Sequence, residues 1–128
     1  MSSNYKLVFG VVLGAALGAA AVQGLHAQAK PKAYSVTETE VLDATAQAAY
    51  SPQVQAAQKA AGGRSFRTAG GRIVALEGAA APKRVGLTEW DSLEQAEAFY
   101  KSKAWNDLAP QRDKAVKTIR RYAVEAMN

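Results

Sequence analysis

The side chains that could carry chemistry in this chain are carboxylates, arginines and aromatic rings. We expect Glu77 and Glu89 to lie on neighbouring strands, where they could share a cleft with Arg72 or Arg84. A carboxylate whose pKa is raised by burial can act as a general base toward an acidic substrate proton. The same residues could form ordinary strand-end or cross-strand ion pairs, which are common and weak. We favour the ion pairs.

Aromatic residues indicate where a ligand would sit. Tyr50, Tyr100, Trp90 and Trp105 could line a pocket between a sheet and its helices. Packing in the hydrophobic core accounts equally well for Phe99 and for most of Trp90. Tyr100 and Trp105 are therefore the pocket candidates, with core packing as the favoured alternative for both.

Arg112 follows Pro110 at the close of the second helical region. Its guanidinium could hold a ligand carboxylate through two parallel hydrogen bonds, or it could cap the last helical carbonyl groups, which we favour. Arg120 and Arg121 lie on opposite faces of the last predicted strand, so at least one should face solvent or an interface. We assign no catalytic residue. The candidate binding residues are Arg72, Glu77, Arg84, Glu89, Tyr100, Trp105 and Arg112.

Residue types exclude several classes of site after residue 29. The only histidine of the chain is His26, and there is no cysteine. Imidazole or thiolate metal sites, haem binding through a histidine, and Ser-His-Asp or Cys-His nucleophiles all lack a necessary residue. We therefore predict no metal and no cofactor.

The first 29 residues have the three parts of a secretory signal peptide. Lys6 lies beside the amino terminus, an apolar run covers residues 7–22, and the tripeptide Ala27-Gln28-Ala29 follows. The run is shorter than the roughly 20 residues that span a membrane. We predict cleavage after Ala29, export to the periplasm or the medium, and one domain over residues 30–128. The alternative is an uncleaved anchor at the outer face of the membrane.

The charge of the chain does not indicate a polyanionic partner. The net charge is +5, and it becomes +4 when Lys6 leaves with the signal segment. Basic residues are spread from Lys30 to Arg121 rather than gathered in one run. We therefore expect an ordinary solubilising surface and no nucleic-acid partner.

The first half of the predicted domain reads as strand, helix and hairpin. Residues 34–42 alternate as a strand does, and a helix follows from Asp43 as N-cap to Gly62-Gly63. Pro52 should kink or split that helix near Tyr50. The runs RSFRTA and RIVALE, separated by Gly70-Gly71, are typical of a tight hairpin. Their glycine spacing does not match a phosphate-binding loop or a dinucleotide turn.

The second half reads as strand, helix and strand. KRVGLTEW is a strand, and the helix after it can begin with a capping box, Asp91 with Glu94 or Ser92 with Gln95. TIRRYAVEA forms the last strand. The order βαββαβ predicts an α+β ferredoxin-like fold, an antiparallel sheet with two helices on one face. Nothing remains to cover the other face, so we expect a homodimer whose sheets face each other.

The chain resembles the family catalogued as domain of unknown function 1330. That family is similar to the dimeric α/β-barrel group, which includes antibiotic-biosynthesis monooxygenases. The resemblance covers about residues 32–125, departs from the family's common SPEY at residues 102–105, and implies a ferredoxin-like subunit and a dimer but no reaction. It rests on Gly62-Gly63-Arg64, Gly70-Gly71-Arg72, Glu77-Gly78, Arg84, Asp91-Ser92, Phe99-Tyr100, Pro110 and Arg112, with Tyr50 where the family tends to carry a tyrosine.

Three functions follow from these observations. We expect an exported dimer that binds a small organic molecule between sheet and helices. The first alternative is a cofactor-free enzyme, monooxygenase-like or isomerase-like, that uses Glu and Tyr for proton transfer. The second is a structural dimer without a ligand.

Overall fold

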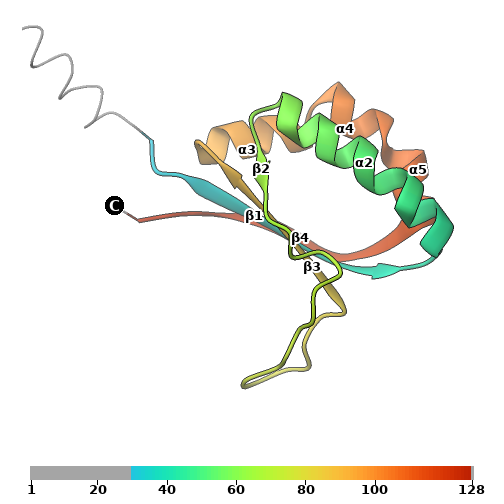
Figure 1. The fold of residues 1–128 in the computed structure, drawn as a ribbon. Helices are drawn as coiled ribbons and strands as arrows, with labels where there is room; N and C mark the ends of the chain where they lie inside the picture. The colour runs from blue at the N-terminus through green and yellow to red at the C-terminus, as the bar shows by residue number, and fades with distance from the viewer. Residues whose placement is uncertain (1–29, 128) are drawn as a thin grey trace, which may run out of the picture. The chain divides into compact units, whose positions relative to one another are not determined.

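The computed structural model describes residues 30–127, so the predicted signal segment lies outside the described residues. Four strands form one antiparallel sheet of order β2-β3-β1-β4, and all the described helices lie on one of its faces (Figure 1). This is the predicted α+β, ferredoxin-like arrangement. The strands are β1 (Ala33–Val41), β2 (Arg64–Ser65), β3 (Arg84–Trp90) and β4 (Val116–Glu125), and the helices are α2 (Ala44–Ala60), α3 (Leu93–Tyr100), α4 (Lys103–Asp107) and α5 (Ala109–Ala115).

β1 lies at the centre of the sheet, between β3 and β4. Its register with β4 shifts between Glu38 and Thr39, which marks an irregularity of the β-bulge kind. Because side chains alternate along a strand, Ser35 and Thr37 face the helices while Val36 and Glu38 face the other way. The sheet therefore has a helix-facing side and a side that no described helix covers.

α2 begins as its sequence predicts. The Asp43 side chain accepts a hydrogen bond from the Ala46 N–H at 2.9 Å, and the chain leaves the helix through Gly62, whose φ is 93°. The prediction that Pro52 would split the helix is wrong, because α2 is one element from Ala44 to Ala60. Pro52 and Ala48 are both exposed, so water can reach the Ala48 carbonyl group that loses its helical donor.

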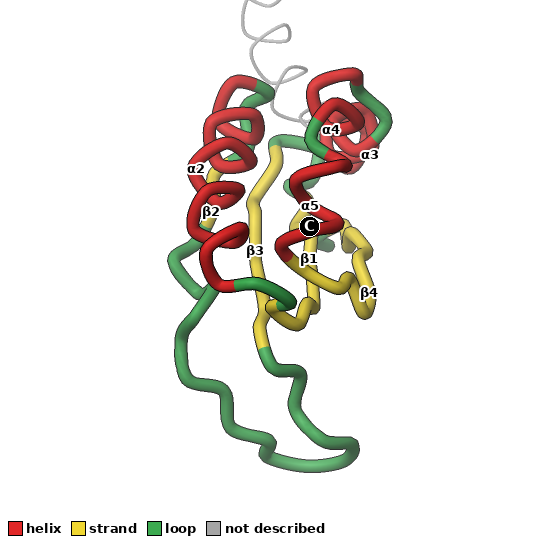
Figure 2. Tube along the Cα trace, turned by 90° about the vertical axis from the view of Figure 1, so that its right-hand side faces the viewer, coloured by secondary structure: helices red, strands yellow, loops and turns green. Residues whose placement is uncertain are grey.

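The predicted hairpin is correct at its turn and wrong in its strands. The Gly71 N–H donates to the Thr68 carbonyl at 2.9 Å, and Gly70 has a φ of 82°. Residues 73–77 form no strand. The first run pairs with β3 instead, since the Phe66 N–H donates to the Leu87 carbonyl at 2.9 Å. Residues 66–83 therefore form a long loop that extends beyond the sheet and the helices (Figure 2).

The main core lies between the sheet and the helices. Trp90, Phe99 and Trp105 are buried there, and the Trp90 and Phe99 ring centroids are 5.2 Å apart. Gly63 allows the close approach, because a Cβ at that position would lie 2.9 Å from the Trp90 ring. α3 begins after the predicted N-cap Ser92, whose Oγ accepts a hydrogen bond from the Gln95 N–H at 3.1 Å.

The start of the last strand and the second helical region differ from the sequence prediction. β4 begins at Val116, two residues before the predicted run. The predicted second helical region is three short helices, α3, α4 and α5, which Ser102 and Leu108 separate. None of the helices within residues 30–127 has the length and apolar character to cross a membrane.

Candidate functional site

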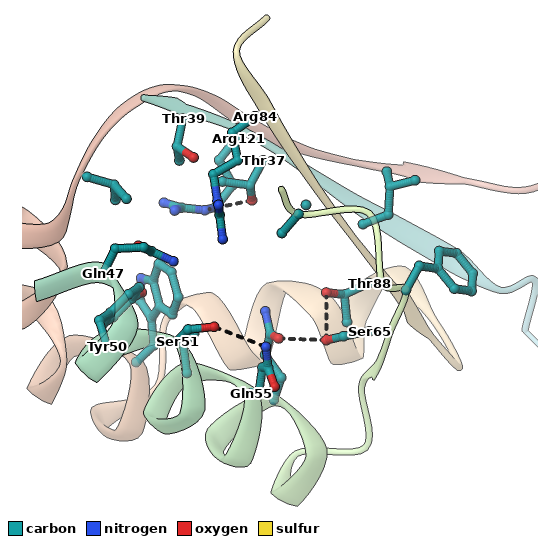
Figure 3. Close-up of a pocket in the computed structure, with 18 of the residues that line it drawn as sticks. Thr37, Thr39, Gln47, Tyr50, Ser51, Gln55, Ser65, Arg84, Thr88 and Arg121 are labelled. Atoms are coloured by element: carbon teal, nitrogen blue, oxygen red, sulfur yellow. Dashed lines mark hydrogen bonds between the residues drawn. The ribbon is translucent and has the colours of Figure 1, made fainter. Parts of the chain in front are cut away.

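A cavity of about 120 Å³ lies between α2 and the helix-facing side of the sheet (Figure 3). Some of the residues that line it, such as Gln55 and Phe66, are exposed, so the cavity opens to solvent. The fold places polar side chains on both of its walls. The lining includes Thr37, Gln47, Tyr50, Ser51, Arg84, Tyr100, Trp105 and Arg121.

Arg121 is the central charge of the cavity. Its Nε donates to Thr37 Oγ1 at 3.1 Å, and its guanidinium carbon lies 4.5 Å from the centre of the Trp105 ring and 5.7 Å from that of Tyr100. Burial lowers the pKa of Arg121, and the nearby charge of Arg112 acts in the same direction. An arginine stays protonated at neutral pH even so, and β4 therefore holds a fixed, partly desolvated cation against aromatic rings.

Arg84 extends from β3 into the same cavity (Figure 3). Neither Arg84 nor Arg121 forms an ion pair with a carboxylate within residues 30–127. The cavity lining includes two arginines and no aspartate or glutamate. The cavity is therefore electropositive, and no acidic side chain in its wall neutralises it.

The α2 wall contributes neutral polar groups. Gln55 Nε2 donates to Ser51 Oγ at 3.1 Å, so these two side chains partly satisfy each other. Gln47 Oε1 is buried and has no hydrogen-bond partner. A buried amide without a partner is costly, which makes Gln47 the one polar group of this wall whose environment is incomplete in the described part of the chain.

The rings of Trp105 and Tyr100 form the aromatic floor of the cavity, and Arg112 packs against the Trp105 ring. Its guanidinium carbon lies 3.7 Å from the centre of the Trp105 ring, and its Nη1 donates to the Trp105 carbonyl at 3.2 Å. Arg112 thus takes the capping position and supports the floor rather than lining the cavity. Tyr50 lies beside this floor, and burial raises the pKa of its hydroxyl group.

Trp90 belongs to the core, as the sequence indicated. Its indole N–H donates to Ser35 Oγ at 3.0 Å, and the Ser35 and Tyr100 hydroxyl oxygens are 2.9 Å apart. Tyr100 therefore faces the cavity with its ring while a buried serine holds its hydroxyl group. This bond ties a residue of the cavity floor to the centre of the sheet.

The structure separates the other predicted residues from the cavity. Arg72 and Glu77 lie exposed in the loop 66–83. Glu89 lies on the opposite face of the sheet, where it accepts hydrogen bonds from Arg64 Nε at 2.6 Å and from the Tyr34 hydroxyl at 3.1 Å. The bond from Arg64 lowers the pKa of Glu89, whereas a general base would need a raised one. The cleft shared by Glu77 and Glu89, the less favoured of the two alternatives, does not form, because residues 73–77 are not a strand. Glu89 instead forms an ion pair, the favoured alternative, with Arg64.

Four of the cavity residues named above were not singled out from the sequence as a ligand site: Thr37, Gln47, Ser51 and Arg121. The alternation rule did place one of the two adjacent arginines on each face of β4. Ala123, which has the same parity as Arg121, packs against the core in the structure, and this identifies Arg121 as the helix-facing arginine of the two. Gln47 gave no signal, because glutamines are frequent throughout that helix.

A second depression of about 380 Å³ lies between α2 and α3 and is lined mainly by alanines. Its polar groups are already satisfied. Gln95 Nε2 donates to the Ala61 carbonyl at 3.1 Å, Gln95 Oε1 accepts from the Asp91 N–H at 2.7 Å, and Ser102 Oγ donates to the Phe99 carbonyl at 2.6 Å. This depression has no free group to orient a ligand, so the first cavity is the better candidate. The described residues also contain no group of acidic or imidazole side chains that could hold a metal ion.

Comparison with known proteins agrees with this architecture. The sequence model of the family described as domain of unknown function (DUF1330) matches residues 32–127. A protein of unknown function from Rhodopseudomonas palustris has a similar crystal structure, with a TM-score of 0.61 at 15% identity over 84% of this chain and 92% of that one. A methylated form of that protein gives a TM-score of 0.59 at 14% identity, over 84% and 90% of the two chains.

A candidate antibiotic-biosynthesis monooxygenase from Chloroflexus aurantiacus gives a TM-score of 0.43 at 14% identity, over 75% of this chain and 94% of that one. No curated protein matches the sequence. The likeness to the two Rhodopseudomonas palustris structures, at such low identity, establishes the fold and no chemistry.

Proposed function

The chain belongs to the DUF1330 family, and on that premise we propose that it binds a small organic molecule in the cavity between α2 and the sheet. The observation that carries the proposal is the arrangement around Arg121. A partly buried cation, an aromatic floor and an unpaired buried amide converge on one cavity. Convergent polar groups in a largely apolar concavity are typical of a ligand site.

Binding is a better match to this cavity than carboxylate catalysis. A cofactor-free proton transfer by glutamate would need an acidic residue in the wall, and the lining has none. The Tyr100 hydroxyl is engaged in another interaction, since it pairs with Ser35. We therefore place binding ahead of the enzymatic alternative.

We further propose that the protein is a homodimer in which the two uncovered sheet faces stack. Apolar side chains of three strands lie on this face, with Val36 central and with Leu87 and Tyr122 directly opposite it in the register. Near the centre of this face, Arg120 and Glu38 neutralise each other, because Arg120 Nη2 lies 2.8 Å from Glu38 Oε2. An apolar face with neutralised charges suits a second copy of the same surface.

Export of the domain is part of the same proposal. The signal-like segment over residues 1–29 supports it, and the absence of cysteine means that the domain needs no disulfide to fold in an oxidising compartment. Mass measurement of the protein recovered from periplasm and medium tests it. A protein that begins after Ala29 is expected, and recovery of the intact chain in the cytosol would contradict export.

Native mass spectrometry of the protein, purified gently from its own cells, tests the binding function. We expect a reproducible small adduct that the variant Ser51→Phe loses, because the ring would fill the cavity from α2. Ala49→Phe is the matched control, since Ala49 is exposed on the same helix and does not line the cavity. A protein without any adduct, or an adduct that persists in Ser51→Phe, would contradict binding at this site.

A further inference from the structure

We propose that the ligand of this cavity is a small hydroxylated organic acid, whose carboxylate pairs with Arg121 and whose hydroxyl group meets Gln47. The inference rests on the proposed binding function and adds the chemical class of the ligand. It is argued from three features of the wall: the unmatched cations, the unused donors of Arg121 and the unpaired amide.

The first feature is the charge balance. Arg84, Arg112 and Arg121 surround or support one cavity, and no acidic side chain lines it. Arg112 is buried against Trp105, and its charge acts on Arg121. On the opposite face of the sheet the chain pairs its arginines with acids, as Arg64 does with Glu89 and Arg120 with Glu38. Only the cavity side is left without an anion among the described residues.

The second feature is the donor geometry of Arg121. Its Nε is used by Thr37, while its Nη1 and Nη2 atoms have no protein partner in the described part of the chain. The planar guanidinium presents these terminal donors as a fork that matches the two oxygens of a carboxylate. Thr37 fixes the direction of the fork, so a carboxylate would be bound without a large rearrangement of the side chain.

The third feature identifies a second group on the ligand. Gln47 Oε1 is buried without a partner, and the Gln47 and Arg121 side chains face the same cavity from opposite walls (Figure 3). Because Oε1 itself is covered, the amide must turn about its last torsion to bring the oxygen to the cavity, and a ligand hydroxyl group, which can donate and accept, can bond to either end of the amide. The Trp105 and Tyr100 rings offer apolar contact to the body of the ligand. A compact acid with a neighbouring hydroxyl group combines these requirements.

Isothermal titration of the purified protein with matched pairs of probes tests the inference. One set contains small hydroxycarboxylic acids, with salicylate as the aromatic member, and the other contains their neutral primary amides. We expect the acids to bind about tenfold more tightly than the amides, as charge-assisted hydrogen bonds require. Arg121→Gln should remove this preference. Arg121→Lys should keep part of it, because the charge remains while the fork is lost.

Lys117→Gln is the control variant, since it removes one exposed positive charge from the same strand without touching the cavity. It should bind the acids like the parent protein. Equal binding of acids and amides would overturn the acid inference and leave the binding function in place. Failure of every acid to bind at about 10 mM would also overturn it, and the adduct lost in Ser51→Phe then decides the binding function separately. An unchanged preference in a folded Arg121→Gln would place the anion elsewhere and overturn the assignment.

Discussion

Arg120 and Arg121 are neighbours in β4, and their side chains lie on opposite faces of the sheet. Arg120 reaches Glu38 at 2.8 Å on the uncovered face, while Arg121 donates to Thr37 at 3.1 Å beneath the helices. Glu38 and Thr37 are themselves neighbours in β1. One of these two adjacent cross-strand pairs therefore belongs to the proposed interface and the other to the proposed ligand site. A shift of β4 by one residue would move Arg120 to the cavity side of the sheet and Arg121 to the uncovered face.

Removing the central apolar residue of the uncovered face should break the proposed dimer. In Val36→Glu, a charge would be buried between two sheets without a partner, which is strongly unfavourable. We expect a monomer by light scattering at concentrations where the parent protein is a dimer. Ala56→Glu, an exposed position on α2, should leave the dimer intact. A parent protein that is itself monomeric would refute the stacked-sheet interface.

Gly63→Ala should destabilise the fold by about 1–3 kcal/mol. The added methyl group would meet the Trp90 ring at 2.9 Å and Thr88 Cγ2 at 3.0 Å, both within the packed core. Urea unfolding monitored by tryptophan fluorescence measures the change as a lower midpoint. At Gly86, the nearest atoms to an added Cβ are 4.0 Å away, so Gly86→Ala is the control and should differ little. Equal midpoints for the two variants would contradict the close packing assigned to Gly63.

Arg112→Lys should lower the free energy of unfolding by about 2 kcal/mol, even though the charge is conserved. Lysine cannot stack a flat group on Trp105, and a single ammonium on a flexible stem caps the Trp105 carbonyl less well. Gln111→Lys, exposed at the preceding position, should be close to neutral. Differential scanning calorimetry compares the two. Similar melting temperatures in both variants would argue that Arg112 is a surface group rather than a support of the floor.

Stability should fall in acid partly through the Arg64 cluster. Hydrogen bonding to Arg64 lowers the pKa of Glu89 and of Asp91 in the folded protein. The unfolded chain then takes up protons first as the pH falls, so this contribution is present above the ordinary carboxyl pKa of about 4 and is lost below it. The cluster is solvated, and the effect should therefore be small and weaker in high salt.

Melting temperatures of the parent protein and of Arg64→Gln, followed from pH 7 to pH 3, measure that contribution. The two curves should converge as the pH falls below about 4, because the variant has already lost the pairs. Parallel curves over the whole range would show that Arg64 does not set the acid response. Lys83→Gln removes an exposed cation outside this cluster and should run parallel to the parent protein.

Local signals in the sequence predicted most of the fold. Asp43, Ser92 and the paired glycines mark ends of elements through hydrogen bonds that each makes with its own neighbours, and such bonds depend on residues a few positions apart. The failures are of another kind. Residues 73–77 have strand-like composition, yet β3 already pairs with the segment that they were expected to join. Strand composition alone does not provide a partner.

The candidate site was predicted only in part for the same reason. Tyr100 and Trp105, for which core packing was favoured over a pocket, pack in or against the core and also line the cavity, and the candidate binding residue Arg84 lines it too. Arg121 was recognisable only as one of two arginines, because the choice of face depends on how β4 pairs with β1. Glu89 was a candidate binding residue, and its strand parity places it on the opposite face of the sheet, in the kind of ion pair that was favoured for it. Site residues that come from distant strands require the register, and the register is a property of the whole sheet.

The pairing of β1 with β4 also sets the order in which the molecule can be completed. The central strand is made first, but the arginine that contacts Glu38 follows 82 residues later. Pairing of β1 with β3 alone would leave the other edge of β1 open until β4 is available. Contacts of such long sequence separation slow folding and leave strand edges open to wrong partners, so the docking of β4 (Val116–Glu125) closes the edge through which the chain could aggregate.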